Sequence, residues 1–82
     1  MAFDYSQLTP EMIKAARALL GWKQDDLVAA SGVSKTTLQV LESGGTVADR
    51  TRRDVFLAFE RVGMEFYNHD EPGLRLRKQS SD

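Results

Sequence analysis

Glycine residues divide positions 9–63 of this 82-residue chain into short segments, each with apolar residues at helical spacing. The breaks lie at Gly21, Gly32, Gly44-Gly45 and Gly63. A glycine directly after a periodic apolar stretch commonly ends a helix. Because a chain of this length supports one small domain with one core, the segments are expected to pack into a single helical bundle.

The first segment begins with three independent helix-start signals. Thr9 is a suitable N-cap, Pro10 suits the first helical position, and Glu11 places an acid in the first turn. The apolar side consists of Met12, Ala16, Leu19 and Leu20. This spacing predicts a helix over 10–20 with one face toward the core.

Two short helices are expected next, at 24–30 and 34–43, with Ser34 as the cap of the second. The tight turn between them contains Gly32. Two short helices joined in this way form a helix-turn-helix, whose second helix can enter the major groove of DNA. Helical hairpins also serve purely structural ends, so the spacing alone leaves both interpretations open.

The helix at 34–43 has two different sides. Leu38 and Leu41 form its apolar side. The other side presents Lys35, Thr36, Gln39 and Val40. Lysine can donate to guanine, glutamine can pair with adenine, and threonine or valine can contact a thymine methyl group. The face suits base readout, although a merely solvated surface would carry similar residues.

A longer helix is expected from about residue 49 to 62, with Val55, Ala58, Phe59 and Val62 on one face. Phe56 and Leu57 lie off this face. They are interpreted either as single exposed apolar residues or as a subunit contact.

Residues 64–67 and 74–78 alternate apolar and polar side chains and flank the turn-rich sequence NHDEPG. This pattern predicts a β-hairpin. Since a lone hairpin is marginal in water, its Met64/Phe66 and Leu74/Leu76 face must cover the helices or join a second copy. The expected organisation is an N-terminal arm (1–8), a helical DNA-binding domain (9–63), a hairpin extension (64–78) and a disordered tail (79–82).

The sequence GWKQDDLVAASGVSKTTLQVLESG resembles the phage repressor and Cro group of helix-turn-helix proteins, the XRE-like family. The resemblance rests on Gln24, Leu27, Ala30, Gly32-Val33-Ser34, Thr37-Leu38 and Glu42-x-Gly44. The sequences LTPEMIKAARALLGW, GMEF and GLRLR extend it to the small single-domain bacterial members. It implies a mainly α, lambda-repressor-like domain of about four helices, and a homodimeric transcriptional regulator that acts as a repressor.

The resemblance also implies the residues that contact double-stranded DNA. They are Lys23, Gln24, Ser34, Lys35, Thr36, Gln39, Val40 and Ser43. In relatives the residue at Gln24 contacts a phosphate, which suits a side-chain amide at a helix N-terminus. Relatives also pair an arginine and a glutamate at the positions of Arg17 and Glu42, which implies a structural ion pair.

The chain departs from the family pattern at three positions. Lys23 replaces the usual serine or threonine cap and cannot accept a hydrogen bond, so it is expected to reach a phosphate instead. Arg52 stands where an apolar residue is common and Phe56 where a polar one is usual. These two changes put the partner surface of the last helix in doubt.

The formal net charge is −1, and acids near the helix-turn-helix nearly balance the bases. The bases are Lys23, Lys35, Arg50, Arg52 and Arg53; the acids are Asp25, Asp26, Glu42 and Asp49. Counterion release supplies most non-specific affinity, so one subunit is expected to bind weakly and with strong salt dependence. A twofold dimer would place two reading helices about 34–36 Å apart.

Other functional classes find less support. Adjacent helical side chains such as Asp25 and Asp26 point about 100° apart, so they do not form a catalytic pair and are assigned to the helix dipole. His69 is a lone turn histidine, and no phosphate-binding loop or nucleophile turn is present. No enzyme activity, cofactor or metal is therefore expected.

The chain contains no cysteine, and its first residues resemble neither a signal peptide nor a membrane anchor, so a cytoplasmic location is expected. Two alternatives remain. One is an antitoxin-like module that binds a toxin partner and its own promoter, with the hairpin, Phe56 and Leu57 as contacts. The other is an accessory protein whose helix-turn-helix no longer binds DNA.

Overall fold

The computed structural model describes residues 3–68 and 71–77. The elements, in chain order, are a short 3-10 turn η1 (Tyr5–Gln7), α1 (Pro10–Leu20), α2 (Gln24–Ser31), α3 (Lys35–Glu42), α4 (Asp49–Arg61), β1 (Met64–Asn68) and β2 (Pro72–Leu76). The predicted mainly helical fold with a C-terminal hairpin is confirmed. Predictions that concern His69, Asp70, Lys78 and the tail 79–82 lie outside the described residues.

Helix α1 has its predicted bounds. The Thr9 hydroxyl accepts a hydrogen bond from the Met12 N–H at 3.1 Å, and Gly21 ends the helix in the left-handed conformation with φ 70°. Helices α2 and α4 also begin where predicted, whereas α3 is one residue shorter at each end than the predicted 34–43, because Ser34 and Ser43 are its caps. Helix α2 includes Ser31, which was assigned to the turn, and α4 ends at Arg61 rather than at residue 62. Helix ends fray, so local propensity places them only to within a residue or two.

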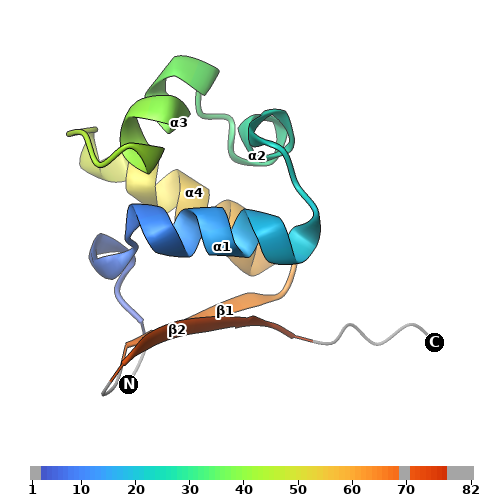
Figure 1. The fold of residues 1–82 in the computed structure, drawn as a ribbon. Coiled ribbons are helices and arrows are strands. Elements are labelled where there is room, and N and C mark those ends of the chain that lie inside the picture. Colours follow the sequence, from blue (N-terminus) through green and yellow to red (C-terminus); the bar gives the residue numbers. More distant parts are fainter. Residues whose placement is uncertain (1–2, 69–70, 78–82) are drawn as a thin grey trace.

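The helices and the hairpin share one core. Its buried apolar residues are Leu8, Met12, Ile13, Ala16, Leu27, Val33, Leu38, Leu41, Val55, Ala58, Phe59, Met64 and Phe66. Phe59 is the largest fully buried side chain, and Trp22 stacks on it with ring centroids 5.9 Å apart. In Figure 1, α1 and α4 lie between α3 on one side of the molecule and the hairpin on the other.

The hairpin covers the helices, as one of the two sequence-based interpretations required. It is antiparallel, with Met64 opposite Leu76 and Phe66 opposite Leu74, and Met64 and Phe66 are buried. Leu76 differs, since 39% of its surface remains exposed. The second strand begins at Pro72, two residues before the predicted start. Proline is tolerated at the first position of a strand, where its missing N–H breaks no essential pairing.

The N-terminal segment packs along α4 and the hairpin. The Phe3 ring contacts those of Phe56 and Phe66 at centroid distances of 5.9 and 5.5 Å, and Phe56 lies 5.8 Å from Phe66. The Arg52 Nε donates to the Leu8 carbonyl at 3.2 Å. Arg52 and Phe56, the two α4 residues that depart from the family pattern, thus both have partners within the chain. Phe56 was expected to be a lone exposed residue or a subunit contact, but its ring belongs to this aromatic cluster.

Candidate nucleic-acid interface

The turn between α2 and α3 is built from local interactions. Gly32 has φ 77°, and a Cβ there would meet nothing within 4 Å, so the left-handed backbone rather than space requires glycine. Ser34 caps α3: its Oγ accepts from the Thr37 N–H at 3.2 Å and donates to the Thr37 Oγ1 at 2.9 Å. Val33 is buried beside the turn. These contacts fix the direction in which α3 leaves the turn.

Helix α3 has the two-sided character predicted from its sequence. Leu38 and Leu41 are fully buried. The residues on the opposite side, Lys35, Thr36, Gln39 and Val40, are all exposed. A helix held by one buried side thus presents four side chains able to reach base edges.

The loop after α3 supports the last of these four residues. The Gly45 N–H donates to the Val40 carbonyl at 2.9 Å, and a Cβ on Gly45 would lie 2.7 Å from the Val40 Cγ1. The Ser43 hydroxyl donates to the same carbonyl at 3.0 Å. Val40, 37% exposed, therefore has one methyl group against the loop.

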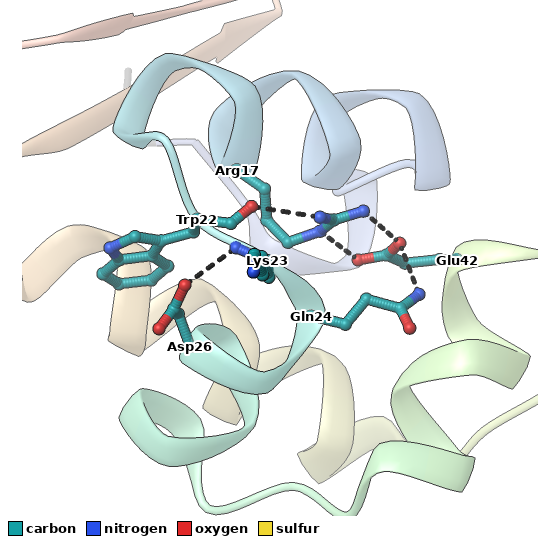
Figure 2. A network of polar contacts seen from close by, with 6 residues as sticks. All are labelled: Arg17, Trp22, Lys23, Gln24, Asp26 and Glu42. Carbon is teal, nitrogen blue, oxygen red and sulfur yellow. Dashed lines mark hydrogen bonds and ion pairs between the residues drawn. The ribbon is translucent and has the colours of Figure 1, made fainter.

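A buried ion pair anchors the far end of α3, as the resemblance implied. Glu42 is 5% exposed and accepts from the Arg17 Nε and Nη2 at 2.8 Å each. Arg17 also donates to the Trp22 carbonyl at 3.2 Å. Figure 2 shows its guanidinium between this carbonyl and the Glu42 carboxylate. The pair connects α1, the start of α2 and the end of α3.

The same carboxylate holds Gln24. The Gln24 Nε2 donates to the Glu42 Oε1 at 3.1 Å, and the amide oxygen points away from Glu42 (Figure 2). An amide nitrogen has two hydrogens, so one remains available to a further acceptor. The sequence placed Gln24 correctly at the start of α2 but did not reveal this bond, because the partners are 18 positions apart.

Two acids at the start of α2 have roles beyond the helix dipole to which they were assigned. The Asp26 carboxylate accepts from the Lys23 backbone N–H at 2.8 Å. The Lys23 side chain makes no cap bond, as expected from its chemistry. Asp25 forms an ion pair with Lys35, with Nζ and Oδ1 3.0 Å apart. An acid at the third helical position signals the first contact, whereas no sequence signal points to the second.

Comparison with known families identifies this part of the chain. A family model described as helix-turn-helix matches residues 13–52, which cover most of α1, all of α2 and α3, and the start of α4. Residues 13–52 therefore match helix-turn-helix domains of the XRE-like type. Domains of this family are DNA-binding elements of transcriptional regulators. No curated protein matches the chain.

The helix-turn-helix domain brings together the DNA-contacting residues implied by the resemblance. Lys23 and Gln24 lie at the start of α2, and the other six lie on α3 or at its two caps, Ser34 and Ser43. All eight are exposed except Gln24, which is partly buried by its bond to Glu42. Within residues 3–68 and 71–77, no three acidic or histidine side chains gather as a metal site, and no helix could cross a membrane.

Proposed function

We propose that this protein is a sequence-specific transcriptional regulator that reads the major groove with α3 and represses by occupying a promoter site. The observation that carries the proposal is the exposed face of Lys35, Thr36, Gln39 and Val40 on a helix whose other side is buried. A rigidly held helix places such side chains at fixed positions along the base edges, which is the condition for direct readout.

The surrounding residues are assigned to the phosphate backbone. Gln24 has a free amide hydrogen at the N-terminus of α2, where backbone N–H groups also favour an anion. Lys23 is exposed beside it. Ser34 and Ser43, at the two ends of α3, are also exposed, and to donate to a phosphate each hydroxyl would turn away from its present acceptor, the Thr37 Oγ1 or the Val40 carbonyl. These contacts set the register of α3 in the groove, and the four outward residues of α3 supply specificity.

The active form is proposed to be a homodimer, because the nearly neutral domain offers one subunit little phosphate affinity. The hairpin and α3 lie on opposite sides of the molecule (Figure 1), and both α3 helices of a dimer must face the same DNA. Pairing of hairpins edge to edge meets this condition, whereas stacking of their outer faces would turn the two α3 helices apart. The molecule measures 36 × 30 × 19 Å, so copies placed side by side along the longest axis would have centres separated by close to one DNA turn, about 34 Å.

Selection of bound sites from random DNA tests this function. The wild-type protein is expected to enrich a palindromic or near-palindromic motif, and the Lys35→Ala/Thr36→Ala variant is expected to enrich none. Circular dichroism would establish that the variant is folded. If the wild-type protein enriched no motif at low salt, sequence-specific readout would be rejected.

Light scattering over a range of protein concentrations tests the dimer. A mass of one chain for the free protein at every concentration, together with one chain per duplex in the complex, would contradict it. In that case the exposed Leu76 and the partly buried Leu57 would be available to a different protein, as in the antitoxin-like alternative.

A further inference from the structure

The ion pair between Lys35 and Asp25 lies within the proposed DNA interface itself. Lys35 is the first residue of α3, and Asp25 lies in the first turn of α2. Their side chains remain 52% and 73% exposed despite the 3.0 Å contact. The lysine that the proposed function assigns to base readout therefore already has an anionic partner in the free protein.

The neighbouring acid serves a different purpose. Asp26 accepts the Lys23 backbone N–H at 2.8 Å and so completes the start of its own helix. Asp25 instead reaches across to α3. Of these two adjacent carboxylates, the one that contacts the reading helix is that of Asp25.

We propose that Asp25 is a specificity-determining residue that directs Lys35 toward base acceptors and away from phosphates. The proposal rests on the proposed function of α3. An ammonium group has three donors, so Lys35 can keep Asp25 and donate to a neutral guanine oxygen or nitrogen at the same time. A phosphate brought to the same ammonium group meets the Asp25 carboxylate as a like charge and is repelled.

Asp25 therefore lowers the affinity for random DNA, and it lowers the affinity for the operator by less. Non-specific binding depends on phosphate neutralisation, which is the contact that Asp25 opposes. At the operator, the bond from Lys35 to a base survives with Asp25 in place. Asp25 therefore widens the ratio between specific and non-specific binding, which is the quantity that matters among many competing sites.

The test compares Asp25→Asn with the matched variant Asp26→Asn. Both remove one negative charge from adjacent exposed positions, and asparagine at 26 can still accept the Lys23 N–H. Fluorescence anisotropy would be measured on a random-sequence duplex and on the selected site, each over a salt series. Asp25→Asn is expected to tighten random-DNA binding roughly two- to fivefold. The slope of log K against log salt should steepen by about 0.9. The gain on the selected site should be smaller.

A Lys35→Ala background identifies the route of the effect. There, Asp25→Asn and Asp26→Asn are expected to change binding equally, because the partner of Asp25 is gone. Equal effects of the two asparagine variants in the wild-type background would overturn the inference, as would a full Asp25→Asn effect without Lys35. If the wild-type protein bound no DNA at low salt, the proposed function and this inference would both fail. Specific binding with an unchanged ratio in Asp25→Asn would reject the inference alone.

Discussion

The two ends of α3 each carry an ion pair to another helix, and the pairs differ in burial. At the C-terminal end, Glu42 is 5% exposed and bonded to Arg17 of α1. At the N-terminal end, Lys35 is 52% exposed and bonded to Asp25 of α2. Removal of one partner from a buried pair strands a charge away from water, whereas removal from an exposed pair leaves a charge that water solvates. The C-terminal end of α3 therefore holds the fold, whereas its N-terminal end is available to a ligand.

The largest effect is expected from Arg17→Ala. It leaves the Glu42 carboxylate buried with Gln24 as its remaining side-chain donor, at a cost of about 3–5 kcal/mol in the free energy of unfolding. Urea unfolding followed by circular dichroism measures this cost. The double variant Arg17→Met/Glu42→Leu is the control, because removing both charges should restore most of the stability. A single variant as stable as the wild-type protein would mean that the pair does not anchor α3.

Gly45→Ala addresses the C-terminal end of α3 from the loop. A Cβ at this position would lie 2.7 Å from the Val40 Cγ1 and 3.2 Å from the Val40 carbonyl oxygen. Overpacking of this kind costs about 1–3 kcal/mol. Because Val40 belongs to the proposed reading face, site selection with this variant is expected to change preference at the base that Val40 contacts.

Gly44→Ala is not an equivalent control, since Gly44 has φ 88° and a side chain there is strained whatever the space. The double variant Gly45→Ala/Val40→Ala is better matched, because truncation of Val40 removes the methyl group that clashes. If stability did not recover in the double variant, the clash with the Val40 methyl group would not be the cause of the loss.

Local signals in the sequence predicted most of the helical framework. Thr9 and Ser34 cap their helices through the expected hydroxyl groups, and the alternation after residue 63 specified a hairpin. These features depend on neighbours along the chain, where propensity and periodicity act directly. The two-sided character of α3 was predictable for the same reason.

The contacts missed from the sequence join distant parts of the chain. Phe56 was placed off the core because the helical pattern of α4 contains no information about Phe3, which packs on it. Similarly, the spacing of Lys35 and Asp25 does not reveal that the tight turn brings the two helix starts together. Such contacts depend on how the elements dock, which a single sequence does not specify.

Lys35→Ala removes the exposed ion pair at the N-terminal end of α3. An exposed ion pair contributes about 0.2–1 kcal/mol, so the free energy of unfolding should change little. Specific DNA binding should weaken by about 1–3 kcal/mol if Lys35 contacts a guanine. Thermal unfolding and anisotropy on the selected site measure the two quantities. A loss of stability comparable to that of Arg17→Ala would contradict the division between the two ends of α3.

Glu65→Gln removes two further ion pairs, which are exposed and remote from α3. Glu65 contacts Arg75 at 2.8 Å and Arg77 at 3.3 Å on the hairpin, across the molecule from α3 (Figure 1). The hydrogen bond from Arg75 lowers the pKa of the Glu65 carboxyl below its ordinary value of 4.5. A group with a lowered pKa in the folded state stabilises the protein above the unfolded pKa, and this contribution disappears as the pH falls through the folded value.

Between neutral and acidic pH, the free energy of unfolding should therefore fall slightly less for Glu65→Gln than for the wild-type protein. At acidic pH the two proteins should be equally stable in this respect. DNA affinity at neutral pH should stay within about twofold, because an exposed pair this far from the duplex is screened by salt. A large change in affinity would instead link the hairpin to DNA binding through the proposed dimer. Light scattering on the same variant would then show whether the fraction of dimer had changed, and a constant mass would exclude that route.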